Sequence, residues 1–177
     1  MAEWIARCNC GAVELLATGK PIVSAACYCS DCQNAGRDLE QLPGAPKLVG
    51  GDGGTPMVLF RKDRIGVVGG ETLLREYRLN ASTPTRRLVA SCCNTPIAVD
   101  FTRGFWLAVY AERFGASAPP LEMRTMVKQR PAGVTLPSDV PNYESFSGKF
   151  MFRLASSWAR MGFGSPALPS YPSIDPR

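Results

Sequence analysis

The chain has 177 residues, of which 45% are hydrophobic and 20% are charged, and its formal net charge is +5. These values are ordinary for a globular protein, and the length suits one domain, alone or with an appendage. No run of about eighteen apolar residues occurs, so we predict no membrane-spanning segment. The start of the chain, MAEWIARCNCG, lacks a basic segment followed by an apolar one. We therefore predict no secretory signal and a cytoplasmic location.

The positive charge is spread along the chain rather than gathered in one patch. The tight basic clusters are Arg61-Lys62-Asp63-Arg64 and Arg86-Arg87. We interpret both as solvated ends of strands. A nucleic-acid partner is therefore not expected.

Residues 3 to about 115 are predicted to be mainly β. Short runs rich in Val, Ile, Leu, Phe or Tyr are bounded there by Gly, Pro or Asn, which is typical of strands. In chain order the runs are GAVELLATG, PIVSAAC, PMVLFR, RIGVVGG, TLLREYRL, RRLVAS, PIAVDF and FWLAVYAERF. Segments at this spacing predict an antiparallel β-sandwich or a partly open barrel.

One short helix is predicted after the second group of cysteines. Ser30 is a suitable N-cap, and the segment from Cys32 to Leu42 has a helical composition. Pro43 would end the helix.

The C-terminal part of the chain differs in composition. Nine of the fifteen prolines and no cysteine lie between Gly115 and Arg177. We predict a β domain over residues 1–115 that binds zinc and an extension over residues 116–177 that packs on the same domain.

The extension contains one predicted amphipathic helix, at about residues 143–162. Its apolar residues recur at steps of three or four, as expected for one face of a helix. They are Phe146, Phe150, Leu154, Trp158 and Met161. This face is expected to pack on the sheet, and the alternative is a helix that binds a partner.

The seven cysteines carry the clearest chemical signal, because the chain has no histidine. They are Cys8 and Cys10, then Cys27, Cys29 and Cys32, then Cys92 and Cys93. Thiolates this close in sequence converge on one ion when the backbone turns sharply between them. We therefore predict metal binding rather than disulfides, which a reducing compartment and an odd cysteine count both disfavour.

Seven sulfurs divide naturally into four and three, which predicts two zinc ions. Cys27, Cys29 and Cys32 suit an open, catalytic-type site, because one turn and the start of one helix supply all three ligands. The structural site would consist of Cys8, Cys10, Cys92 and Cys93. Adjacent residues of a strand point to opposite faces, so Cys92 and Cys93 share an ion only if the chain turns there. For either of them taken singly, a free core cysteine is the alternative.

Three segments, CNCGAVEL, ACYCSDC and CCNTPIAV, resemble the glutathione-dependent formaldehyde-activating enzyme family, which also contains centromere protein V. That family's pattern is CxCG followed by alternating hydrophobic residues, then CxCxxC, then a strand ending in CxxCGTP. The resemblance covers residues 5 to 115. The third motif departs from the pattern: Asn94 stands in place of Gly, and the earlier cysteine would fall at Ala90, so Cys92 would act from a shifted position.

The resemblance implies a zinc-bearing all-β fold and the addition of a thiol such as glutathione to formaldehyde, or the reverse reaction. The predicted function is thus that of a zinc-dependent carbon–sulfur lyase acting on a thiol adduct. With no histidine, a proton carrier must be a carboxylate, a tyrosine or water, and Asp31 and Tyr28 are nearest in sequence. Arg37 would pair with a substrate carboxylate, unless it is simply an exposed helix residue.

Two other functions fit the same cysteines. One is a binding module that zinc stabilises and that has no turnover, and the other is a thiol-based redox or metal sensor. If the protein is an enzyme, we expect an accessible metal site beside a basic pocket. If it is a structural module, we expect shielded metals and no pocket.

Overall fold

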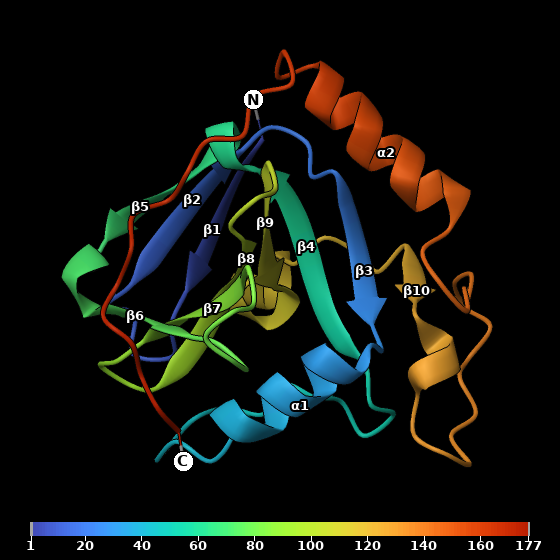
Figure 1. Ribbon diagram of the computed structural model, residues 1–177, viewed down its shortest axis with the longest axis horizontal. Coiled ribbons are helices and arrows are strands. Elements are labelled where there is room, and N and C mark those ends of the chain that lie inside the picture. Colours follow the sequence, from blue (N-terminus) through green and yellow to red (C-terminus); the bar gives the residue numbers. More distant parts are fainter. Residues whose placement is uncertain (1, 177) are drawn as a thin grey trace.

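The structure is a computed structural model that describes residues 2–176, so the predicted domain limits at residues 1 and 177 lie outside the described residues. The first sheet has the strand order β1-β2-β5 and the second has the order β10-β3-β4-β9-β8-β7-β6 (Figure 1). The three-stranded sheet consists of β1 (Glu3–Arg7), β2 (Glu14–Thr18) and β5 (Ile65–Gly69). The seven-stranded sheet consists of β3 (Val23–Cys27), β4 (Thr55–Arg61), β6 (Leu74–Tyr77), β7 (Thr85–Ala90), β8 (Thr95–Phe101), β9 (Trp106–Tyr110) and β10 (Met123–Thr125).

Neighbouring strands of the large sheet run antiparallel, with one exception at its edge. There β10 pairs in parallel with β3, and Thr125 lies opposite Cys27. The segment after Gly115 thus completes the sheet that the N-terminal strands begin.

Two α-helices lie on the outside of the strands, α1 (Ser30–Leu39) and α2 (Gly148–Ala159). The predicted N-cap of α1, Ser30, is wrong by one residue. The cap is Cys29, whose side chain accepts a hydrogen bond from the Cys32 backbone N–H, and Ser30 is the first residue of the helix. Helix α2 begins at the Ser147 cap, whose hydroxyl accepts a bond from Phe150 N–H at 3.1 Å. Short 3-10 turns occupy η1 (Lys62–Arg64), η2 (Glu71–Leu73), η3 (Ala111–Ser117) and η4 (Val127–Gln129).

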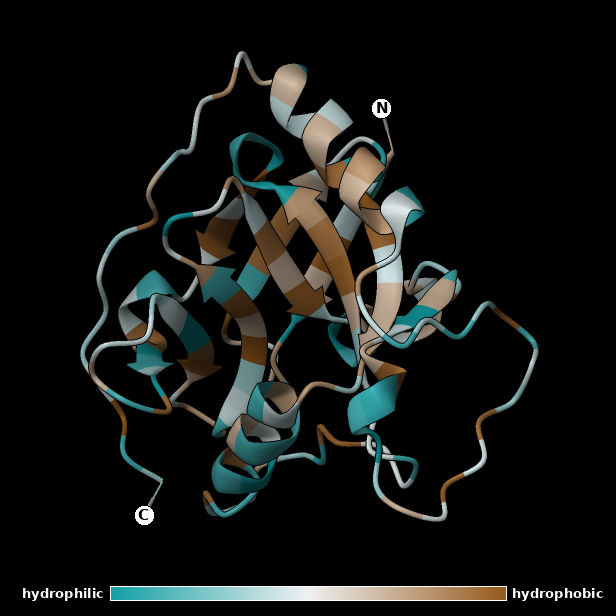
Figure 2. Cartoon of the chain, turned by 45° about the vertical axis from the view of Figure 1, so that its right-hand side comes forward, coloured by the Kyte–Doolittle hydropathy of each residue, from teal (hydrophilic) through white to brown (hydrophobic). Residues whose placement is uncertain are grey.

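The two faces of the seven-stranded sheet are covered differently. One face shares a core with the three-stranded sheet, where Val58, Leu107 and Val109 meet Leu15 and Ala17. The strands of both sheets are strongly hydrophobic, whereas α1 is largely hydrophilic (Figure 2).

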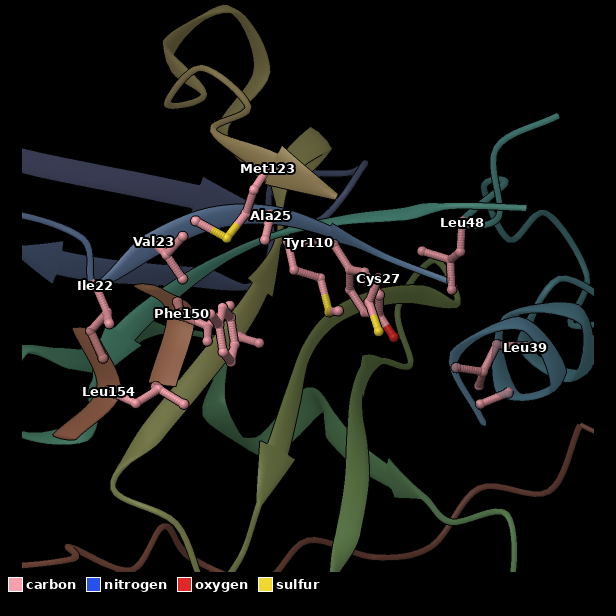
Figure 3. Packing of buried hydrophobic residues seen from close by; sticks show 14 of the residues in the cluster. Ile22, Val23, Ala25, Cys27, Leu39, Leu48, Tyr110, Met123, Phe150 and Leu154 are labelled. Atoms are coloured by element: carbon pink, nitrogen blue, oxygen red, sulfur yellow. The ribbon is translucent and has the colours of Figure 1, made fainter. Parts of the chain in front are cut away.

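Helices rather than strands cover the other face. Leu39 comes from α1, and Phe150 and Leu154 come from α2 (Figure 3). The predicted strand-rich fold with a helix after the second cysteine group and a C-terminal helix is confirmed, but the sheets do not form a clear sandwich. Within residues 2–176 they also form no closed barrel, since β6 and β10 remain separate edges.

The interpretation of the basic clusters as solvated strand ends is wrong for three residues. Lys62, Arg86 and Arg87 are all buried. Asp100 lies between two of them, with its carboxylate oxygens 2.8 Å from Lys62 Nζ and 2.8 Å from Arg86 Nε. Arg86 also pairs with Glu76 at 2.5 Å. Lys62 and Arg86 can be internal because the carboxylates of Asp100 and Glu76 neutralise them.

Neither described helix combines the length and apolar content that crossing a membrane requires.

Candidate metal centres and the adjoining cavity

The seven cysteines gather into two groups. Four of them, Cys8, Cys10, Cys92 and Cys93, have sulfurs within 4.8 Å of one another. The other three, Cys27, Cys29 and Cys32, form a second group by the same measure. We call these the four-cysteine cluster and the three-cysteine cluster.

The four-cysteine cluster joins two loops that are far apart in sequence. Cys8 and Cys10 lie between β1 and β2, and Cys92 and Cys93 lie in the turn between β7 and β8. The Sγ atom of Cys92 is 3.8 Å from that of Cys8 and 3.3 Å from that of Cys10. Cys92 therefore joins the cluster although the family's earlier cysteine would fall at Ala90, which is buried at the end of β7.

Two residues with positive φ make these loops turn tightly. Gly11 has φ +78°, and its N–H donates to the Cys8 carbonyl at 3.0 Å. Asn94 has φ +49°, a conformation that asparagine tolerates better than most residues. The turn at Asn94 lets the adjacent Cys92 and Cys93 lie on the same side of the chain.

Further hydrogen bonds hold the two loops together. Thr95 Oγ1 accepts a bond from Asn9 N–H at 3.2 Å and lies 3.0 Å from Cys93 Sγ. Arg113 donates to Asn9 Oδ1 at 2.7 Å. Burial alone would raise the pKa of Cys93, but Thr95 and the neighbouring cysteines lower it to about 6.

The three-cysteine cluster is built from the end of a strand and the start of a helix. Cys27 is the last residue of β3, Cys29 caps α1 and Cys32 lies in its first turn. Arg87 of β7 is 2% exposed and donates to the Asp31 carbonyl at 3.1 Å, which holds this first turn against the sheet. One rigid junction thus positions all three sulfurs.

The three thiols differ in their tendency to ionise. Hydrogen bonds with Cys27 and Cys32 lower the pKa of Cys29 to about 3, and Arg87 acts in the same direction. Cys29 raises the pKa of Cys27 to about 11, and the pKa of Cys32 is raised by both neighbours and by burial. One thiolate therefore forms readily, but three charges this close require a cation.

The donor sets of both clusters fit zinc. Thiolates about 2.3 Å from a tetrahedral ion lie roughly 3.8 Å apart. In the four-cysteine cluster, four Sγ–Sγ distances run from 3.3 to 3.9 Å. Four thiolates complete a tetrahedral shell, whereas three leave one position for another ligand.

A cavity of about 330 Å³ adjoins the three-cysteine cluster. Its floor comes from the sheet, including Met57, Leu59 and Trp106, and α2 covers it with Phe150 and Leu154. No described lysine, arginine, aspartate or glutamate lines it, so the expectation of a basic pocket is wrong. The four-cysteine cluster contributes nothing to this lining.

The residues proposed from sequence to assist the cysteines lie away from the cavity. The Tyr28 hydroxyl donates to Asp52 at 2.5 Å, and Tyr28 packs with Ala26 in a separate small core. Arg37 is exposed and donates to Gln33 Oε1 at 3.1 Å. Neither Tyr28, Asp31 nor Arg37 is among the lining residues, and pairing of Arg37 with a substrate stays a prediction.

Three residues beside the cluster were missed from sequence. Arg87 acts on the pKa of Cys29, and Tyr110 lies close enough to Cys32 and Arg87 for both to act on its own pKa, which burial raises. Thr125 lines the cavity and is 1% exposed. Alternation along FWLAVY places Tyr110 on the same face as Trp106 and Ala108. Once Trp106 or Ala108 is known to line a site, this alternation indicates that Tyr110 lies near it. Thr125 lies in a three-residue strand that has no comparable pattern.

One comparison with known proteins covers the first two cysteine motifs. No curated protein matched the chain. Among solved structures, a Rhodobacter sphaeroides protein from a structural genomics programme is 18% identical, with a TM-score of 0.45, over 78% of this chain and 98% of that chain. The family model described as "Glutathione-dependent formaldehyde-activating enzyme" matches residues 3–40. The matched residues hold five of the seven cysteines, so over this segment the chain is similar to that family.

Proposed function

We propose that this protein is a zinc-dependent carbon–sulfur lyase that acts on the adduct of a thiol and an aldehyde. The adduct of glutathione and formaldehyde is one member of this class of substrates. The observation that carries the proposal is the cavity of about 330 Å³ that opens directly onto Cys27, Cys29 and Cys32. A module with purely structural metals needs no such space at one of its metal sites.

The two clusters would have different roles, one structural and one catalytic. Zinc held by Cys8, Cys10, Cys92 and Cys93 would be structural. Zinc held by Cys27, Cys29 and Cys32 would supply a Lewis acid that favours the thiolate form of a substrate sulfur.

The reaction needs no oxidant. In the adduct R–S–CH₂–OH the carbon–sulfur bond breaks, the carbonyl group of the aldehyde forms, and the hydroxyl proton is passed to the sulfur. The protein must therefore exclude water from the reacting atoms and hold the hydroxyl group in place.

One residue is suited to hold the hydroxyl group, and a second acts on the charge of the cluster. Thr125 lines the cavity and lies directly across the β3–β10 pairing from Cys27, so we assign its hydroxyl the task of binding the adduct's hydroxyl group. Arg87 offsets negative charge at the cluster, because a divalent ion with three thiolates carries a net charge of −1. Arg87 acts through the cysteines and is a positioning residue.

The test is the rate of aldehyde release from S-hydroxymethylglutathione and from adducts of other thiols, measured with the zinc-loaded protein. The wild-type protein should exceed the buffer rate, and Cys29→Ser should abolish the excess. Thr125→Val keeps the shape and removes the hydroxyl, and about a tenfold loss is expected for one hydrogen bond. A wild-type rate equal to that of Cys29→Ser with every adduct would reject the proposal.

A further inference from the structure

The lining of the cavity beside the three-cysteine cluster carries information about the substrate. Apart from the three cysteines, all of its described lining residues are uncharged, and Thr125 supplies its one hydroxyl group. That hydroxyl already has the Ala26 carbonyl within 3.5 Å. A ligand in the cavity therefore meets few hydrogen-bonding groups besides the sulfurs.

Glutathione is poorly matched to such a lining. The molecule carries two carboxylates, one ammonium group and two amides close to its sulfur. Taking these groups out of water without partners is costly. Once its sulfur reached Cys27, Cys29 and Cys32, the adjoining amides would face residues such as Leu59 and Leu154.

Aromatic side chains border the cavity on both sides. From the sheet, Phe101 and Trp106 form a pair with ring centroids 5.6 Å apart. From the C-terminal segment, Phe146 and Phe150 are stacked with centroids 5.1 Å apart. Aromatic groups gain from contact with such rings beyond the area they bury.

We infer that the substrate of this site is the aldehyde adduct of an apolar thiol that carries an aryl or branched alkyl group, rather than of glutathione. The inference rests on the proposed function for its chemistry but on the lining for its specificity. A cavity near the lower end of the roughly 300–1,000 Å³ range of ligand pockets fits one ring with a short linker. The bond broken and the proton transferred are those of the proposed lyase reaction.

Residues at the edge of the cavity give a matched pair of test variants. Met151 lines the cavity and is 51% exposed, so Met151→Glu places a charge at its mouth without burying one. The next residue of α2, Phe152, is 73% exposed and borders a different cavity, so Phe152→Glu is the control. Both changes add the same charge to the same helix.

The experiment is calorimetric titration of the zinc-loaded protein with benzyl mercaptan and, separately, with glutathione. Benzyl mercaptan should bind at least about tenfold more tightly than glutathione. Met151→Glu should weaken its binding by about tenfold, whereas Phe152→Glu should leave it within about twofold. Trp106 lies in the lining, so quenching of tryptophan fluorescence should follow the same order and disappear in Trp106→Phe.

The outcomes separate the inference from the proposed function. Glutathione binding as tightly as benzyl mercaptan, or Met151→Glu and Phe152→Glu having equal effects, would overturn the inference even if adducts are cleaved. Preferential binding of benzyl mercaptan without cleavage of any adduct would support the cavity's specificity and reject the lyase. Cleavage of the benzyl adduct in preference to the glutathione adduct would support both.

Discussion

The two cysteine clusters differ in what holds their sulfurs in place. In the four-cysteine cluster, two loops from opposite parts of the chain meet, and Cys10 and Cys92 are exposed. In the three-cysteine cluster, a strand end and a helix cap hold the sulfurs, and the surrounding core already fixes both elements. A metal should therefore matter to the fold at the first cluster and to chemistry at the second.

The largest expected effect is that of Cys10→Ser. Without a complete ligand set, the β1–β2 loop loses its metal link to the β7–β8 turn, and loss of a structural metal is among the changes that cost about 4 kcal/mol or more. Thermal unfolding and zinc content, measured together, should show a much lower midpoint and one zinc fewer per chain. A variant as stable as the wild type would show that the first cluster does not support the fold.

Asp100→Asn gives a loss of unfolding free energy, at a site without cysteines, with which the loss in Cys10→Ser can be compared. It leaves Lys62 and Arg86 buried with a neutral partner, and breaking a buried pair typically costs about 3–5 kcal/mol. Denaturant unfolding should show this loss, while Arg7→Ala, which breaks the exposed pair with Glu14, should cost about 1 kcal/mol or less. Equal losses would mean that burial of the Asp100 network contributes no extra stability.

Cys29→Ser should have a small effect on stability and a full effect on the second zinc. Serine is a favoured N-cap residue, so the Cys32 N–H keeps a side-chain acceptor and α1 stays capped. We expect a loss of about 1 kcal/mol or less, with one zinc fewer by elemental analysis. If Cys29→Ser and Cys10→Ser unfold the protein equally, both metals are structural and the contrast between the clusters fails.

The smallest effect is a pH dependence that involves neither cluster. Burial alone would raise the pKa of Glu76, but the hydrogen bond and charge of Arg86 lower it below its ordinary value of 4.5. A lowered pKa in the folded state gives stability that is present above pH 4.5 and is lost as the pH falls further. Glu76→Gln should therefore flatten the fall of unfolding free energy below that pH, as measured by urea unfolding. An unchanged slope would contradict the assignment.

Hydrophobic runs and periodicity in the sequence correctly predicted most strands and both helices. The strand runs from GAVELLATG to FWLAVYAERF correspond to β2 through β9, and helix α2 lies inside the predicted range 143–162. Of the predicted apolar stripe, Phe150 and Leu154 are buried, whereas Phe146 and Trp158 are exposed. The cysteine spacing predicted the two clusters, because ligands two or three residues apart can share an ion only in a few backbone shapes.

What the sequence did not reveal depends on contacts between distant segments. Arg86 looks like a surface residue until Asp100 and Glu76 are seen on neighbouring strands, and Arg87 until its bond to the Asp31 carbonyl is seen. Strand β10 is three residues long, and only its pairing with β3 defines it. The cavity combines residues from β3 to α2, so its apolar lining could not be predicted from the spacing of any one motif.

In the proposed lyase, the ligands of the catalytic-type zinc and most of the wall that selects the substrate lie in different stretches of the chain. Both sulfurs of the first CxC and all three of the second motif occur before residue 40, whereas most of the cavity wall is contributed after residue 56. Exchanging Phe146, Phe150 or Met151 would then redirect the protein to new molecules while its thiolates stayed untouched. The proposed chemistry could thus be retargeted by altering α2 and the residues just before it.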